Sequence, residues 1–162
     1  MIKVAVLTLS DKGSRGERED LSGPVIAEMV KRIDGEVISY EIIPDEKDLI
    51  KQRLISLSEK ADIVFTTGGT GLSLRDVTPE ATIAVIEREV RGIAEVMRAE
   101  GMKKTQRAML SRAVAGIRNK SLIINLPGSP KAVRENLEVI LDALPHAVEK
   151  IKGDEKECAR YD

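Results

Sequence analysis

Aromatic residues are almost absent from this sequence of 162 residues, which has one phenylalanine, two tyrosines and no tryptophan. The core must therefore be aliphatic, and a site that stacks nucleic-acid bases on several rings is not expected. The single cysteine, Cys158, excludes an intramolecular disulfide bond and a cysteine-rich metal site. The single histidine, His146, is distant in sequence from the glycine-rich stretches, so a Ser–His or Cys–His nucleophile pair is disfavoured.

A surplus of charge of one sign is also missing, and so is any long apolar run. The 26 basic and 27 acidic side chains give a formal net charge of -1, which argues against nucleic acid as a partner. No stretch approaches the roughly 20 apolar residues that cross a bilayer. The N-terminal stretch MIKVAVLTLS is typical of a core strand and not of a signal peptide. We therefore expect a cytoplasmic protein with neither a membrane nor a nucleic-acid partner.

What the sequence does contain is typical of a single globular domain. Hydrophobic residues make up 42% and charged residues 33% of the chain, and its length suits one core. We expect a domain over residues 1–152 and a charged, frayed tail over residues 153–162.

Hydrophobic periodicity predicts alternating strands and helices. Strands are expected at Lys3–Leu9, Glu36–Ile43, Ala61–Thr67, Ala113–Ile117 and Ser121–Leu126, the last two joined by a tight turn. Helices are expected from Ser22 to about Ile33, at Glu46–Lys60, from Thr78 to about Val90, at about Gly92–Lys104, from Pro130 to about Leu141, and at Pro145–Lys152. Ser22 and Thr78 are the expected N-caps, and Asp11–Asp20 is expected to be a polar loop. This order predicts an α/β fold, a three-layer α/β/α single domain with a mostly parallel sheet and a C-terminal hairpin at its edge.

The sharpest feature is a glycine-rich turn that follows a buried strand. Gly68, Gly69, Thr70 and Gly71 come directly after Ala61–Thr67. In an open α/β sheet ligands bind at the carboxyl ends of the strands, and glycines let backbone N–H groups approach an anion closely. The stretch is neither a P-loop nor a GxGxxG motif. It predicts either an anion site or a plain tight turn.

Two aspartates near predicted strand ends are candidates for contacts with Mg²⁺ or a substrate. Asp76 lies between the glycine turn and the helix predicted at Thr78, and Asp45 follows Pro44. Carboxylate oxygens are preferred ligands of Mg²⁺, and as a pair they could hold the ion on a nucleoside triphosphate. Alternatively, each of them only caps local backbone N–H groups.

A second glycine turn, Pro127–Ser129, stands at a predicted helix N-terminus, which favours anions through its free N–H groups and dipole. Ordinary strand-to-helix turn chemistry would give the same pattern. Asn125, just before it, has the donor and acceptor needed to read a heterocycle edge, or it could simply bond the backbone. Because no usable protein nucleophile is evident, the pattern suits a site in which one bound substrate attacks another.

Several stretches together resemble the MogA/MoaB family of molybdenum cofactor biosynthesis, closest to its molybdopterin adenylyltransferase branch. They are Leu9–Asp11, Ile43–Glu46, Thr66–Gly71 followed by Arg75–Thr82, Ala108–Arg112 and Ile124–Ser129, in the family's order over roughly residues 1–152. One departure is Gly101, where many relatives carry a serine. The resemblance implies transfer of AMP from Mg-ATP to the terminal phosphate of molybdopterin with release of pyrophosphate. The alternative is a MoaB-like, non-catalytic molybdopterin-binding protein.

The same resemblance implies roles for individual residues. Asp45 and Asp76 would carry catalysis or the placement of Mg²⁺ and substrate. The residues that would border the pocket for molybdopterin and the nucleotide are Ser10, Asp11, Ser14, Gly68, Gly69, Thr70, Gly71, Ser111, Asn125, Pro127, Gly128 and Ser129. Family members typically form trimers and MoaB-type members also form hexamers, so a homotrimer is expected, with hand-off of the product to a molybdenum-insertion enzyme.

Overall fold

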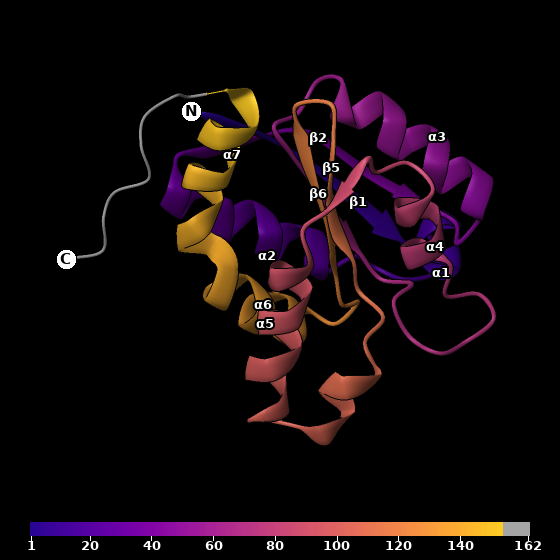
Figure 1. The fold of residues 1–162 in the computed structure, drawn as a ribbon. Coiled ribbons are helices and arrows are strands. Elements are labelled where there is room, and N and C mark those ends of the chain that lie inside the picture. Colours follow the sequence, from indigo (N-terminus) through magenta and orange to yellow (C-terminus); the bar gives the residue numbers. More distant parts are fainter. Residues whose placement is uncertain (154–162) are drawn as a thin grey trace.

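The computed structural model describes residues 1–153 and contains a six-stranded sheet in the order β2-β1-β3-β6-β5-β4 (Figure 1). The strands are β1 Ile2–Leu9, β2 Gly35–Ile43, β3 Ile63–Thr67, β4 Arg88–Glu89, β5 Ala115–Arg118 and β6 Ser121–Leu126. β1, β2, β3 and β6 run parallel, whereas β5 and β4 form an antiparallel edge. The predicted α/β fold, with a mostly parallel sheet and a hairpin toward its edge, is therefore confirmed. The tail predicted at 153–162 falls, apart from Gly153, outside the described residues.

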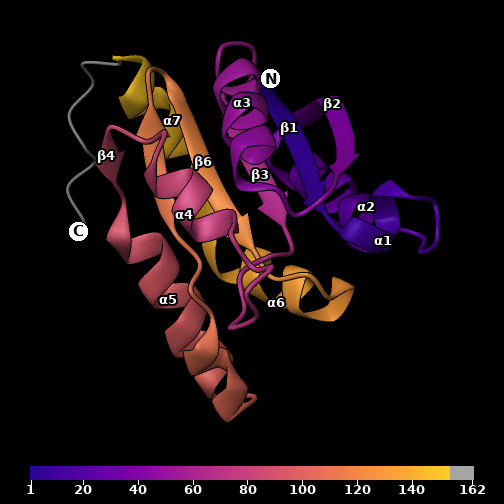
Figure 2. The ribbon, with the colours of Figure 1, turned by 90° about the vertical axis from the view of Figure 1, so that its right-hand side faces the viewer.

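Helices cover both faces of the sheet. They are α1 Asp11–Ser14, α2 Ser22–Met29, η1 Val30–Ile33, α3 Lys47–Ser58, α4 Thr78–Ile83, α5 Arg91–Met102, η2 Gln106–Leu110, α6 Pro130–Ile140, η3 Leu141–Ala143 and α7 Leu144–Lys152. Figures 1 and 2 show α2, α5, α6 and α7 on one face and α3 and α4 on the other. Alternate side chains of β1 divide accordingly, because Val4 and Val6 join the first core cluster while Ala5 and Leu7 join the second. Among the described helices, none is long and apolar enough to cross a membrane.

The parallel strands end level with one another at one edge of the sheet. Leu9 at the end of β1 pairs with Ile43 at the end of β2, and Thr67 at the end of β3 pairs with Leu126 at the end of β6. Thr8 and Thr67 are paired between β1 and β3. The loops that follow these strands therefore leave the sheet as neighbours, so the glycine turn lies beside the loops that carry the other candidate residues.

One predicted helix is shorter than expected. The sequence predicts a helix from Thr78 to about Val90, but α4 ends earlier and the chain then forms β4. The backbone N–H groups of Glu87 and Val90 donate to the carbonyls of Ile117 and Ala115, at 2.8 Å in each case. Pairing along the otherwise open edge of β5 thus takes the place of further helical hydrogen bonds.

The loop predicted at Asp11–Asp20 begins with a helical turn, α1. The Ser10 side-chain oxygen caps this turn by accepting a hydrogen bond from the Gly13 N–H at 2.9 Å. A short polar segment that follows a strand can therefore close into a turn even where the sequence has no hydrophobic periodicity.

The predicted N-caps Ser22 and Thr78 are instead the first helical residues of α2 and α4. The Ser22 hydroxyl donates to the carbonyl of Gly128 at 2.7 Å, and the Thr78 hydroxyl donates to the carbonyl of Gly68 at 3.0 Å. Both hydroxyls thus tie a helix start to a glycine turn, which fixes the two turns relative to the helices.

A buried hydrogen-bond network lies beneath the glycine turn and is centred on Asn125, which is fully buried. The Asn125 side-chain oxygen accepts from the Val114 N–H at 3.1 Å, and its nitrogen donates to the hydroxyls of Thr66 and Thr82 at 3.0 and 2.9 Å. The Thr82 hydroxyl in turn donates to the Thr78 carbonyl at 2.9 Å. Contrary to its expected place in the pocket, Asn125 joins β3, β6 and α4 inside the core.

The substitution Asn125→Ala should destabilise the fold by about 3 kcal/mol or more, because it leaves two threonine hydroxyls and one N–H buried without this partner. Urea unfolding followed by circular dichroism measures the change. Asn136→Ala is the matched control, since the Asn136 side chain donates only to the carbonyl of Ala132 in its own helix. The control should cost about 1 kcal/mol or less, and equal losses in the two variants would contradict the role given to Asn125.

Candidate functional site

A cavity of about 540 Å³, here called the first cavity, lies where the loops after β1, β2, β3 and β6 meet. The predicted site residues that line it are Ser10, Asp45, Gly68, Gly69, Asp76, Gly128 and Ser129. Residues far apart in the sequence thus reach one cavity because the parallel strands end at the same edge of the sheet.

The glycine turn at the wall of this cavity requires glycine at two successive positions. Gly68 and Gly69 have φ angles of 95° and 68°, in the left-handed region. A Cβ atom on Gly68 would lie 2.5 Å from the carbonyl oxygen of Leu9, and one on Gly69 would lie 2.2 Å from the Thr78 hydroxyl oxygen. A Cβ on Gly69 would also lie 3.1 Å from Asp45 Oδ1, so glycine brings the backbone close to that carboxylate.

Several backbone N–H groups at the glycine turns are not used within the fold. Among the described residues, those of Gly69, Thr70 and Gly71 donate no hydrogen bond, and neither do those of Gly128 and Ser129. Unpaired backbone donors at a cavity wall are available to a bound anion. The geometry therefore favours an anion site over a plain tight turn.

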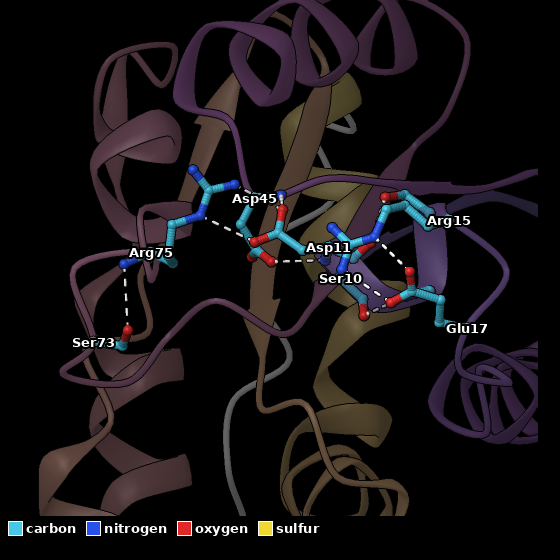
Figure 3. A network of polar contacts seen from close by, with 9 residues as sticks. Ser10, Asp11, Arg15, Glu17, Asp45, Ser73 and Arg75 are labelled. Carbon is cyan, nitrogen blue, oxygen red and sulfur yellow. Dashed lines mark hydrogen bonds and ion pairs between the residues drawn. The ribbon is translucent and has the colours of Figure 1, made fainter.

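Two aspartates and one arginine, Asp11, Asp45 and Arg75, link the loops beside the first cavity (Figure 3). The backbone N–H of Asp11 donates to Asp45 Oδ2 at 3.1 Å, and the backbone N–H of Asp45 donates to Asp11 Oδ1 at 3.0 Å. The Arg75 guanidinium donates to both oxygens of the Asp11 carboxylate, at 3.0 and 2.7 Å. Asp11 thus connects the loop of Asp45 to the loop that follows the glycine turn.

The two linked carboxyls have pKa values shifted in opposite directions. Burial raises the pKa of Asp45 above its ordinary value, and the nearby charges of Asp11 and Asp76 add to this shift. The hydrogen bonds from Arg75 lower the pKa of Asp11. Of these two carboxyls, Asp45 is therefore the one whose negative charge the protein stabilises less. This is expected of a carboxylate whose charge is balanced by a bound cation.

Asp45 and Asp76 both line the first cavity, and their carboxylates could supply two of the oxygen ligands that Mg²⁺ prefers. Asp76 Oδ2 accepts from the Ser73 N–H at 2.9 Å, whereas the Oδ1 atoms of Asp45 and Asp76 accept no hydrogen bond from the described residues. A Cβ on Gly71 would lie 2.8 Å from Asp76 Oδ2, so glycine leaves room for this carboxylate. No group of three or more His, Cys, Asp or Glu side chains in residues 1–153 is arranged to hold a metal ion. A cation here would thus take its remaining oxygen ligands from a substrate and water.

The glycine turn and the residues that follow it, 68–77, are here called the glycine loop. A second cavity of about 510 Å³ lies on the other side of this loop. The predicted site residues that line it are Thr70, Gly71, Ser111 and Pro127, and Gly101 lines it as well. Its wall also includes the apolar side chains of Leu72, Ala94, Met97, Ala108, Leu110 and Ala113. Because Gly68, Gly69 and Asp76 face the first cavity, a single loop separates the two.

Three predicted site residues line neither cavity. Asn125 is in the core, as described above, and Asp11 acts through its contacts with Asp45 and Arg75. The Ser14 hydroxyl is exposed and donates to the carbonyl of Asp11 at 2.8 Å. The other predicted site residues each line one of the two cavities, so the structure separates only these three from the rest.

Asp20 lines the first cavity and was not among the predicted site residues. Its carboxylate accepts from the Thr8 hydroxyl at 2.6 Å, from the Tyr40 hydroxyl and from the Ser22 N–H at 2.9 Å. Burial acts to raise the pKa of Asp20, but these hydrogen bonds outweigh it and leave the pKa below its ordinary value. The position of an aspartate two residues before a helix start is a capping signal that could have identified it.

The fold and the cavities define an α/β domain with two cavities at the carboxyl edge of a mostly parallel sheet. A family model described as "Probable molybdopterin binding domain" matches residues 5–146. The chain therefore belongs to this molybdopterin-binding domain family.

Relatives and solved structures agree with this family. The chain is 48% identical over 157 residues to a molybdopterin adenylyltransferase of Helicobacter pylori, which covers 94% of this chain and 89% of that protein. It is 49% identical to the molybdopterin biosynthesis enzyme MoaB of Thermus thermophilus, with a TM-score of 0.90 over 95% of this chain and 98% of that one. The tungsten cofactor synthesizing protein MoaB of Pyrococcus furiosus is 38% identical, with a TM-score of 0.85 over 93% and 97%.

The raised pKa of Asp45 predicts that Asp45→Asn gains stability relative to the parent as the pH rises from about 4 to 7. In the parent, the Asp45 contribution is fully present below the unfolded pKa of 3.8 and is lost as the pH rises through the higher folded pKa. Asparagine does not ionise and escapes this loss. Urea unfolding at several pH values in EDTA measures the difference.

Asp11→Asn is the matched control, because its folded pKa is lowered from 3.8. The Asp11 contribution is present above the unfolded pKa and is lost as the pH falls through the folded pKa. Asp11→Asn should therefore be less stable than the parent at pH 7, with the gap narrowing in acid. The same pH slope in both variants would contradict these shifts.

Proposed function

We propose that this chain is a molybdopterin adenylyltransferase, which transfers AMP from Mg-ATP to the terminal phosphate of molybdopterin and releases pyrophosphate. The observation that carries the proposal is the shared glycine loop, which has unused N–H groups and separates a carboxylate-bearing cavity from a more apolar one. The names of relatives such as the H. pylori enzyme support the same reaction.

In this proposal the first cavity holds the nucleotide phosphates. The N–H groups of Gly69, Thr70 and Gly71, together with those of Gly128 and Ser129, bind phosphate oxygens. Asp45 and Asp76 hold the Mg²⁺ that arrives with ATP, which neutralises charge on the phosphates. The polar lining of this cavity suits a charged ligand better than a flat heterocycle.

The second cavity then holds the pterin of molybdopterin. Its lining combines the apolar side chains named above with polar groups such as Arg98, Glu135 and Asn136, as expected of a site for a flat ring with polar edges. The phosphate of molybdopterin lies toward the glycine loop, so it reaches the α-phosphate of ATP across that loop.

The chemistry requires no protein nucleophile. An oxygen of the molybdopterin phosphate forms a bond to the α-phosphorus of ATP, and the bond from that phosphorus to the bridging oxygen breaks, so that pyrophosphate leaves. His146 lies in α7 and lines neither cavity, and Cys158 lies outside the described residues. The protein contributes by orientation and by backbone donors that stabilise charge on the transferring group.

Assembly and location belong to the same proposal. We infer a cytoplasmic homotrimer, with a hexamer as the alternative, that passes its product to a molybdenum-insertion enzyme. The exposed apolar side chains of Ile83 and Met109, at 58% and 56%, support burial against other copies. Light scattering after size exclusion should give three chains per particle, and a monomer at micromolar concentration would contradict it.

The proposed reaction predicts that purified protein with molybdopterin, ATP and Mg²⁺ forms adenylylated molybdopterin and pyrophosphate, as measured by mass spectrometry. Asp76→Asn and Asp45→Asn should each slow product formation by about a hundredfold or more, since each removes charge from the Mg²⁺ and phosphate site. EDTA should abolish turnover of the parent.

Asp48→Asn is the matched control, because this carboxylate is 90% exposed at the start of α3 and lines neither cavity. It should retain the parent's rate. Tight molybdopterin binding with no ATP-dependent product would instead support the MoaB-like binding protein. Unchanged turnover in both the Asp45 and Asp76 variants would remove the roles given to them.

A further inference from the structure

Arg112 lies between η2 and β5, and it makes four hydrogen bonds to the glycine turn, to the loop that follows the turn and to α4. Its backbone N–H donates to the carbonyl of Thr70 at 3.0 Å. Its guanidinium donates to the carbonyl of Gly71 at 2.8 Å, to the carbonyl of Asp76 at 2.6 Å and to the carboxylate of Glu80. One residue thus bonds the beginning and the end of the loop and the first turn of α4.

Little else fastens this loop to the rest of the domain. The side chains of Leu72 and Leu74 are 66% and 99% exposed, and of the apolar side chains in residues 71–77 only that of Val77 packs against a core cluster. Its internal contacts, from the Asp76 N–H to the Ser73 carbonyl and from the Ser73 N–H to Asp76 Oδ2, connect loop residues only to one another. The other side-chain link, from Arg75 to Asp11, is more exposed, with 59% of the Arg75 side chain accessible.

The guanidinium is suited to this task in a way that an ammonium is not. It is planar and presents five N–H donors in a fixed arrangement, so it can serve two carbonyls and a carboxylate at once. Glu80 balances its charge, and Arg112 retains only 35% exposure of its side chain. Lysine at this position would keep the charge but could not keep all three side-chain bonds.

We propose that Arg112 is a positioning residue that fixes the glycine loop as the common wall of both cavities. By holding the Asp76 carbonyl it orients the Asp76 carboxylate toward the first cavity, and by holding Thr70 and Gly71 it shapes the second. Arg112 lines neither cavity, so it acts through the loop and not on a ligand. The proposal rests on the proposed function for its kinetic consequence but not for its structural one.

The test compares Arg112→Lys and Arg112→Ala with the parent by two independent measurements. Hydrogen–deuterium exchange of the ligand-free protein should accelerate by about tenfold or more in peptides covering residues 70–77 and remain unchanged in β1 and β3. The kcat of adenylyl transfer should fall by about a hundredfold in both variants, since a displacement of about 1 Å at a reacting group has an effect of that size. Added guanidinium at millimolar concentration should restore part of the kcat of Arg112→Ala, which a purely structural defect would not allow.

Arg118→Lys is the matched control. Arg118 is also partly buried and donates to a backbone carbonyl, that of Val85 at 3.0 Å, but it makes no contact with the glycine loop. Its variant should keep the parent's kcat and the parent's exchange in residues 70–77. A loss of activity equal to that of Arg112→Lys would show that any weakened arginine has this effect and would overturn the proposal.

Failure of this proposal is distinguishable from failure of the proposed function. If the parent turns over and Arg112→Lys keeps kcat within about threefold, the positioning role is wrong, whatever happens to exchange. If the parent makes no product, calorimetry with ATP and with molybdopterin decides instead. Arg112→Lys should then weaken both ligands, and unchanged affinity for either one would overturn the common-wall role.

Discussion

The buried side-chain amide of Asn125 is the interaction on which the position of the glycine turn depends. It joins β6 to Thr66 on β3 and to Thr82 on α4, and Thr82 is bonded to Thr78. Thr78 in turn holds the carbonyl of Gly68. A continuous chain of hydrogen bonds therefore runs from the middle of the sheet to the turn, in surroundings where a missing partner is costly. The core therefore fixes the position of the turn, while Gly68 and Gly69 allow its left-handed backbone conformation.

This placement explains how a glycine turn can keep several N–H groups free. Such groups are normally satisfied within a fold, and those of Gly69, Thr70 and Gly71 remain available only because contacts from other elements hold the turn. The carbonyls of the same loop are in use, by Thr78 at Gly68 and by Arg112 at Thr70, Gly71 and Asp76. The carbonyls of this loop are thus bonded within the protein while several of its N–H groups are not, which is the arrangement that the proposed phosphate site requires.

The features that the sequence predicts well are those that depend on local pattern. The buried strands, the glycine turn and the aspartates after strand ends follow from periodicity and from residue type, and the parallel sheet brings Asp45 and Asp76 to one cavity. The direction in which an individual side chain points depends on packing between distant segments. Asn125 has the same donor and acceptor whether it meets a ligand or two threonines, so its burial cannot be read from its neighbours in sequence.

Arg112 and β4 are two features that the sequence does not predict. The guanidinium of Arg112 binds carbonyl groups some 36 to 41 positions away, and every residue has a carbonyl, so the sequence does not reveal these bonds. The stretch around Glu87 has a helical pattern in the sequence, but in the fold it pairs with the edge of β5. Long-range backbone contacts decide both cases. A cavity that retains unpaired donors and the like charges of Asp45 and Asp76 is less stable than a closed turn would be, so the fold must offset this cost elsewhere. The Asn125 network and the Arg112 contacts lie directly beneath and beside that cavity, where they can offset it without covering the groups that a ligand needs.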